Sequence, residues 1–157
     1  MSGPERGEVY EIHRSFRVPL GFAFRWCTDY TSADGRISKE GNDRQILRRG
    51  RGVVVYEDLY PSPHGWMWSR QTVRLYPPDR WTATASGNYR TWRLVYTLRP
   101  AADGSTQFTM RGLRRPTLLG LRNPSQRAMK AELQRMWSQY GRAMEADYRK
   151  LRRRTRT

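Results

Sequence analysis

The stretch from Asn123 to Leu151 carries the longest uninterrupted helical pattern in the sequence, and it restricts what the rest of the chain can form. Apolar or aromatic residues recur there every three or four positions, so they share one face of a helix. A helix of roughly 28 residues is about 42 Å long, too long for one of several equal members of a small bundle. Its apolar face therefore needs a wide partner surface. The residues on that face are Met129, Leu133, Met136, Trp137, Tyr140, Met144, Tyr148 and Leu151.

Both ends of this helix are marked. Asn123 followed by Pro124 is typical of an N-cap and a first-turn proline, because both suit a helix start with unpaired N–H groups. Lys150 and the arginines after it lie where the helix dipole favours cations. We expect the helix to begin at Asn123 and to end near Leu151.

The chain before this helix alternates between apolar and polar residues, as strands do. Turns rich in Gly, Pro and Asp recur about every 8 to 12 residues, which indicates one antiparallel sheet of about seven strands. A short helix over Leu20–Tyr30 is expected after the first strand, and Thr31–Asn42 is expected to hold a second short helical turn and a loop. The prediction is an α+β fold with the sheet wrapped around the long helix. The expected strands are Val9–Val18, Arg44–Arg49, Val53–Tyr60, Trp66–Tyr76, Arg80–Ser86, Tyr89–Leu98 and Thr106–Leu113.

The domain organisation follows from these elements. Residues 1–8 are expected to form a loose leader, residues 9–151 a single domain, and residues 152–157 a basic tail.

The chain is strongly basic, with 30 Lys and Arg against 14 Asp and Glu and a formal net charge of +16. This charge favours acidic partners without naming one. Only Lys39, Lys130 and Lys150 among the cations are lysines. Genome base composition explains the arginine excess as well as selection for phosphate binding does.

The single cysteine, Cys27, excludes an intramolecular disulfide and a thiolate metal cluster, and it indicates a reducing compartment. No apolar run follows a basic start, and no stretch approaches the roughly 18 to 20 apolar residues that span a bilayer. We expect a soluble cytoplasmic protein whose contact with membranes, if it has one, is peripheral.

The order of elements resembles a known superfamily. The segment Phe16–Pro19 and the aromatic-rich helix that ends at Asp29 resemble the first strand, proline corner and first helix of the START-related lipid-transfer and polyketide cyclase/dehydratase superfamily (SRPBCC). The segments Arg90–Tyr96 and Gly104–Thr109 resemble its paired strands before the last helix. The resemblance covers about Val9 to Leu151 and implies a helix-grip fold, with a cavity between sheet and helix for a lipid, polyketide, isoprenoid or other apolar ligand.

The residues themselves are compatible with such a cavity. Met, Trp and Tyr side chains on the helix are large and adaptable, and Trp and Tyr can present one polar atom to an otherwise apolar ligand. A filled core would show the same pattern, so both interpretations stay open. The expected ligand-binding residues are Trp68, Arg70, Trp92, Tyr96, Phe108, Met110, Met129, Leu133, Trp137, Tyr140 and Met144.

Few residues indicate catalysis, and we predict no metal, no cofactor and no defined catalytic residue. His13 and His64 lie on different segments, without the spacing of a metal site. His13 is expected on the outer sheet face beside Glu11, and His64 in a turn. Cys27 is expected in the core, where a thiolate nucleophile does not form.

Acid–base chemistry is the remaining enzymatic route, and the related cyclases and dehydratases would use it. The ionisable candidates on the predicted inner face are Arg14, Arg70, Glu145 and Asp147. An inward arginine could hold a carboxylate or an enolate oxygen. The alternative is an inward arginine paired with an acid of the long helix, because an unpaired buried charge is costly.

Two basic clusters complete the sequence. These clusters either stay solvated without a specific partner or bind an anionic membrane or nucleic acid. Nucleic acid is the least favoured, because the aromatic residues between the arginines lie on strands that need them for the core. Leu118, Leu119 and Leu121 beside the first cluster could form a lid or a membrane contact. The clusters are Arg111, Arg114, Arg115, Arg122 and Arg127, and then Arg149, Lys150, Arg152, Arg153, Arg154 and Arg156.

Three functions follow. The first is a carrier that binds a hydrophobic small molecule between sheet and helix, with the basic tail directed to an anionic membrane. The second is a polyketide cyclase or dehydratase in which Arg and Tyr side chains polarise carbonyls. The third is a basic interaction protein with a filled core.

Overall fold

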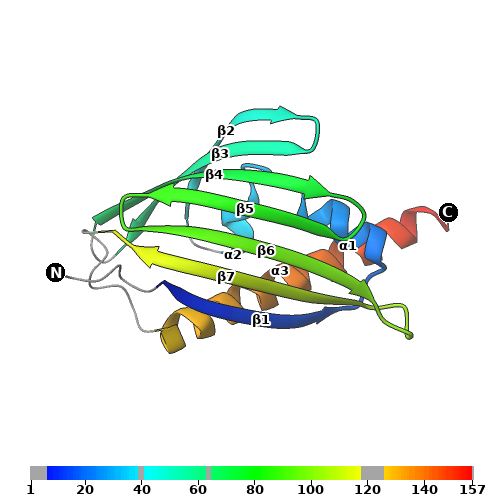
Figure 1. The fold of residues 1–157 in the computed structure, drawn as a ribbon. Helices are drawn as coiled ribbons and strands as arrows, with labels where there is room; N and C mark the ends of the chain where they lie inside the picture. Colours follow the sequence, from blue (N-terminus) through cyan, green and yellow to red (C-terminus); the bar gives the residue numbers. More distant parts are fainter. Residues whose placement is uncertain (1–6, 39–40, 63–64, 118–125, 157) are drawn as a thin grey trace.

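A seven-stranded antiparallel sheet curves around one long helix in the computed structural model, which describes residues 7–38, 41–62, 65–117 and 126–156 (Figure 1). The expected α+β helix-grip fold is confirmed. The elements are β1 (Glu8–Phe16), α1 (Leu20–Cys27), α2 (Asp34–Ser38), β2 (Asp43–Gly50), β3 (Val53–Ser62), β4 (Gly65–Tyr76), β5 (Arg80–Gly87), β6 (Arg90–Pro100), β7 (Thr106–Pro116) and α3 (Gln126–Arg154).

The strands lie in the order β1-β7-β6-β5-β4-β3-β2, so the first strand returns to pair with the last one. All three helices lie behind the sheet in the view of Figure 1, and the near face of the sheet is not covered by any helix of the described ranges. The sheet therefore has an inner face against the helices and an outer face toward solvent. Tight antiparallel connections between successive strands explain this simple order.

Most of the strand alternation is as predicted. In β6, Leu94, Tyr96 and Leu98 are buried against the helices. Their neighbours Arg93 and Val95 are exposed on the outer face. Because side chains alternate between the faces of a strand, burial of one series places the other series on the outer face.

The predicted orientation of β4 is wrong. Trp68 and Arg70 were expected to point inward, but the side chain of Trp68 is 37% exposed and Arg70 donates hydrogen bonds to Glu57 on the outer face. Ser69 and Val73 are buried instead. Both series of alternating residues in this strand contain apolar side chains, and a shift of one residue moves every side chain to the other face.

The helix α3 continues to Arg154, three residues beyond its predicted end at Leu151. Its predicted start at Asn123 and Pro124 lies outside the described residues. Met129, Trp137 and Met144 are buried against the sheet at the spacing the sequence indicated. No helix of the described ranges is long and apolar enough to span a membrane.

Polar side chains fasten α3 to the elements around it. The Arg14 guanidinium donates to the Gln134 carbonyl oxygen at 2.6 Å, so its partner is a backbone group and not the acid that was expected. Glu145 accepts from the Arg17 backbone N–H at 3.0 Å, and Asp147 accepts from the Trp26 indole N–H at 3.0 Å. These acids join the helix to the residue that follows β1 and to α1.

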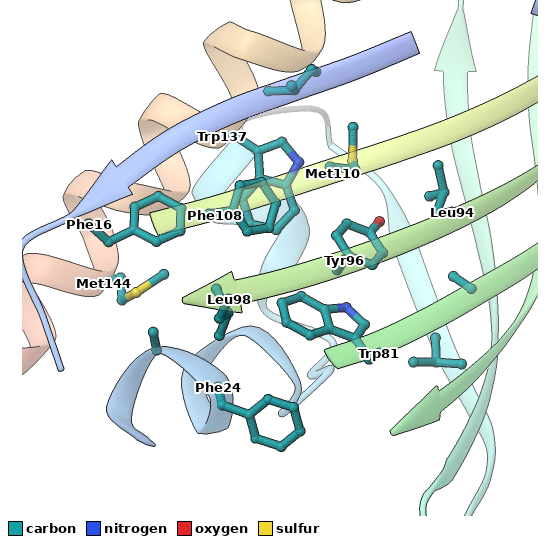
Figure 2. Packing of buried hydrophobic residues seen from close by; sticks show 14 of the residues in the cluster. Phe16, Phe24, Trp81, Leu94, Tyr96, Leu98, Phe108, Met110, Trp137 and Met144 are labelled. Atoms are coloured by element: carbon teal, nitrogen blue, oxygen red, sulfur yellow. The ribbon is translucent and has the colours of Figure 1, made fainter. Parts of the chain in front are cut away.

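Aromatic rings fill one end of the space between the sheet and the helices (Figure 2). Trp81 stacks on Tyr96 at a centroid distance of 4.8 Å, and Phe108 lies 4.2 Å from Trp137. Phe108 and Met144, which were expected to line a cavity, are almost fully buried in this packed end. Large aromatic area buried at one end holds the sheet and α3 together there.

A glycine of α3 permits the close contact with β1. A Cβ atom at Gly141 would lie 3.0 Å from two ring carbons of Phe16, whose ring is buried and contacts Phe108 and Trp137. We expect Gly141→Ala to lower the free energy of unfolding by about 1 to 3 kcal/mol, because the ring cannot move away. Urea unfolding measures the change.

The matched control is Gly21→Ala in α1, where the nearest atom is the flexible end of Arg25 at 3.4 Å. The free energy of unfolding of this variant should rise by up to about 1 kcal/mol, because alanine has a higher helix propensity than glycine. Equal stabilisation by both substitutions would contradict a tight contact at Gly141.

Candidate functional site

A cavity of about 770 Å³ lies between the inner face of the sheet and the N-terminal half of α3. It begins where the aromatic packing ends, and α1, α2 and the neighbouring strands close its side. The helix contributes Met129, Glu132, Leu133, Arg135, Met136, Trp137 and Tyr140 to its wall. The sheet contributes residues that include Tyr10, Arg44, Tyr56, Asp58, Met67, Ser69, Gln71, Trp92, Leu94, Tyr96, Met110 and Arg114.

Most residues predicted for a cavity meet in this wall, and four do not. Trp68 and Arg70 lie on the outer sheet face, and Phe108 and Met144 lie in the packed end. For the seven predicted residues that do line the cavity, a role in ligand binding stays a prediction. The predicted residues that line the cavity are Trp92, Tyr96, Met110, Met129, Leu133, Trp137 and Tyr140.

Tyrosine side chains give the cavity polar atoms without charge. Burial is the main cause that raises the pKa of Tyr30, Tyr56 and Tyr96 well above the usual value, and it also raises that of Tyr10. Their hydroxyls therefore stay protonated at neutral pH and can donate hydrogen bonds. The Tyr56 hydroxyl donates to Gln71 Oε1 at 2.7 Å.

A buried ion cluster forms one side of the wall, where β2, β3 and α2 meet. Arg44 donates to both carboxylate oxygens of Asp58, at 2.7 and 2.8 Å, and to Asp34 Oδ2 at 2.6 Å. Its guanidinium also lies 4.2 Å from the ring centroid of Tyr56. Burial is the largest single effect on Arg44 and lowers its pKa, but the hydrogen bond to Asp58 and the nearby Asp58 and Asp34 carboxylates contribute to a net rise of this pKa. The cluster is thus a fixed, paired group of charges.

A second buried arginine lies at the opposite edge of the sheet. Arg114 is only 3% exposed, and it forms an ion pair with Glu8, its directly opposite residue on β1. The sequence grouped Arg114 with a surface cluster, which is wrong for this residue because its strand position faces inward. Arg111 and Arg115 are exposed, and Arg122 lies outside the described residues.

The polar atoms of the wall without a hydrogen-bond partner among the described residues include the acceptor Asn42 Oδ1 and two donors. The donors are Ser69 Oγ and Trp137 Nε1, and their residues are 2% and 7% exposed. In Figure 2 the Trp137 nitrogen and the Tyr96 hydroxyl both point away from the packed end, toward Met110 and Leu94. A buried donor without a partner is costly, so these atoms mark positions where a bound molecule could place oxygen atoms.

Cys27, His13 and His64 are the residues that the sequence offered for nucleophilic or metal chemistry. Burial raises the pKa of the half-buried Cys27 thiol, which keeps it protonated. His13 lies on the outer face with Nε2 2.8 Å from Glu11, as expected, and His64 lies outside the described residues. No group of three or more potential metal ligands occurs within the described ranges.

Asp29 is a titratable group of the cavity wall whose charge changes near neutral pH. Partial burial, and then the nearby Asp34 carboxylate, raise the pKa of Asp29 to about 6. Arg49 donates to the Asp29 backbone carbonyl at 2.8 Å, which fixes this turn after α1. Asp29 can therefore accept or donate a proton close to neutral pH.

Sequence reasoning missed the charged and polar wall residues, above all Arg44, Asp58 and Ser69. The series Val54, Tyr56 and Asp58 points inward, but Val53 and Val55 are also apolar and conceal which series is buried. Arg44 stands in a strand with two other arginines and nothing local distinguishes it. Its role depends on Asp34 and Asp58, which the fold brings to it.

Solved structures with this architecture cover nearly the whole chain. TTHA0849 from Thermus thermophilus has a TM-score of 0.76 at 12% identity, with 89% of this chain and 99% of that chain covered. The Zhui aromatase/cyclase from Streptomyces sp. R1128 has a TM-score of 0.69 at 11% identity, with coverages of 90% and 93%. A START superfamily protein from Mycobacterium smegmatis has a TM-score of 0.65 at 12% identity, with coverages of 91% and 98%.

No family model and no curated protein matches the sequence. At such low identities the structural likeness establishes the fold alone. The chain has the START-like helix-grip fold that the residue pattern resembled.

The raised pKa of Asp29 leads to a pH-dependent prediction. A carboxyl whose pKa rises from 3.8 to about 6 on folding lowers stability above about pH 6, where it is ionised, and has no such cost below about pH 4. Asp29→Asn should therefore raise the free energy of unfolding by about 1 kcal/mol at pH 7.5, a value reduced for solvent screening, and leave it unchanged at pH 4. Urea unfolding at both pH values measures this.

Asp43→Asn is the control, because it removes the same charge from an exposed strand residue. It should change stability by less than about 0.5 kcal/mol at either pH. A gain for Asp29→Asn that is equal at pH 4 and pH 7.5 would show that the carboxylate charge is not its cause.

Proposed function

We propose that this START-like helix-grip protein binds a mainly apolar small molecule, which carries a few oxygen atoms, in the cavity between the sheet and α3. The observation that carries the proposal is a cavity of about 770 Å³ whose wall holds two buried donors, on Ser69 and Trp137, without a partner in the described residues. Pockets of roughly 300 to 1,000 Å³ are typical of small-molecule sites.

The chemistry of the wall supports this ligand class. Leu94, Met110, Met129, Leu133 and Met136 provide apolar contact along one side. The tyrosine hydroxyls, Ser69 and Trp137 provide hydrogen-bond donors for oxygen atoms of the ligand. A purely aliphatic chain would leave the Ser69 and Trp137 donors unpaired, and a strongly charged molecule would meet mostly apolar surface.

The three expected functions differ in what they require of the interior. A carrier and an enzyme both need an open cavity, whereas the interaction protein with a filled core does not. The cavity beside α3 therefore favours a ligand-binding function. The aromatase/cyclase among the similar structures has the same fold and is compatible with ligand binding here.

An enzyme of the cyclase or dehydratase type is the second candidate, because Asp29 has a pKa of about 6 at the cavity wall. In this function Asp29 transfers a proton while tyrosine hydroxyls hold a ligand carbonyl. A carrier releases the molecule that it bound, whereas an enzyme releases a changed one.

Filling the cavity tests the proposed binding. Leu133→Trp adds bulk to the wall from α3, so it should weaken binding of the neutral fluorescent probe N-phenyl-1-naphthylamine about tenfold or more. A neutral probe avoids attraction to the basic surface. Fluorescence titration measures the affinity, and circular dichroism confirms that the variant is folded.

Leu151→Trp is the matched control, because the same substitution on the same helix falls on a side chain that is 47% exposed. It should bind the probe like the unchanged protein. Equal affinity in all three proteins would exclude the cavity as the probe site.

The native ligand separates carrier from enzyme. Native mass spectrometry of protein from its own host, before and after organic extraction, should reveal an extractable mass. The extracted molecules are then incubated with the protein and with Asp29→Asn. Conversion that is lost in Asp29→Asn supports the enzyme, and unchanged molecules support the carrier.

A further inference from the structure

The outer face of the sheet carries an unusual arrangement of side chains. The outward series of β4 reads Trp66, Trp68, Arg70, Thr72, Arg74 and Tyr76. Trp66 is 62% exposed, Trp68 is 37% exposed and Tyr76 is 41% exposed. Large aromatic side chains normally cover the core, so an exposed series interleaved with arginines requires another explanation.

The neighbouring strands extend this series with arginines and hydroxyl groups. The strands β4, β5, β6 and β7 contain no Asp or Glu. Between the outward arginines stand Thr82, Thr84, Thr91 and Thr97, whose hydroxyls can donate to phosphate oxygens. The outward arginines are Arg70, Arg74, Arg80, Arg93, Arg99, Arg111 and Arg115.

The register shows how the sheet tolerates so many like charges. Arg74 is opposite Val53 and Thr82, Arg93 is opposite Thr84 and Leu113, and Arg111 is opposite Glu11 and Val95. No two of the seven arginines are directly opposite one another. Several of them stand at diagonal positions about 7 to 8 Å apart, where repulsion is weaker, as Arg74 and Arg80 do.

We propose that this outer face binds single-stranded nucleic acid, with arginines and threonines contacting phosphates and with Trp66, Trp68 and Tyr76 stacking on bases. Arginine makes bidentate hydrogen bonds to phosphate, and aromatic rings stack on any unpaired base. Successive outward side chains of one strand are about 6.6 Å apart, so the twelve residues of β4 present a surface about 40 Å long. This surface is independent of the cavity on the other side of the sheet.

The structure removes one of the reasons for which the sequence disfavoured nucleic acid. Aromatic residues among the arginines seemed to be needed for the core, but the three on β4 point outward and cover no core. Duplexes fit less well, because their bases are already stacked. An anionic membrane fits less well because β5, β6 and β7 expose only Val95 among their large apolar side chains in the described ranges.

Fluorescence anisotropy with fluorescein-labelled oligo(U) and oligo(dT) of about 20 nucleotides tests the proposal. The double variant Trp66→Ala with Trp68→Ala should bind about tenfold or more weakly, with an unchanged dependence on salt. The triple variant Arg74→Gln, Arg93→Gln and Arg111→Gln should make the negative slope of log K against log salt less steep by about 2. All five side chains are exposed, so folding should be preserved.

The matched control removes three exposed arginines from α3, as Arg142→Gln, Arg149→Gln and Arg153→Gln. This variant has the same net charge as the triple sheet variant and should keep the original salt slope. Any one of four results would overturn the proposal. They are no binding by the unchanged protein at about 50 mM salt, equal effects of both triple variants, equal affinity for duplex DNA, and no effect of the tryptophan substitutions.

A membrane surface is tested with the same proteins. Vesicles of phosphatidylcholine and phosphatidylglycerol should bind the tryptophan double variant as well as they bind the unchanged protein. Vesicle binding that is lost in this variant, while oligonucleotide binding is kept, would assign Trp66 and Trp68 to lipid and overturn the proposal.

Discussion

The structure depends on one constraint, which is that one long helix and two short ones must cover the inner face of a seven-stranded sheet. Seven strands about 4.8 Å apart span roughly 29 Å if flat, whereas a helix with its side chains is about 10 to 12 Å wide. Curvature of the sheet reduces this difference without removing it. Aromatic rings such as Trp81, Phe108 and Trp137 fill one end, and α1 adds Phe24 to them. The other end has no comparable filling among the described residues, so the cavity follows from the same constraint that shapes the fold.

The charged groups of the cavity wall connect neighbouring elements at the two edges of the sheet. Arg44 joins β2 to β3 and α2 through Asp58 and Asp34, and Arg114 joins β7 to β1 through Glu8. Buried ion pairs add little net stability, because desolvation costs about as much as the attraction returns. Their effect is to fix the positions of edge elements and to give an otherwise apolar cavity a defined polarity.

The sequence predicted the elements well and the orientation of side chains less well. The period in α3 and the turn residues between strands are local signals, and they placed every strand and the described end of α3 within a few residues. The prediction of which face of β4 is buried was wrong, because large aromatic residues such as Trp66 and Trp68 are typical of a buried series. The buried residues are Ser69 and Val73. The Arg44 cluster could not be found at all, because its partners come from two other elements, α2 and β3, and only the folded chain brings them together.

The strand β4 shows why both proposed surfaces can exist in so small a protein. Its inward residues Met67, Ser69 and Gln71 line the cavity, and its outward residues include Trp66, Trp68 and Arg70. Alternation assigns neighbouring residues to opposite faces, so substitutions on one face leave the side chains of the other in place. A filled interior would have required large apolar residues at positions 69 and 71, where the chain has polar ones. The same strand can thus hold an oxygen-bearing ligand on one side and a phosphate chain on the other, and neither surface needs the other in order to form.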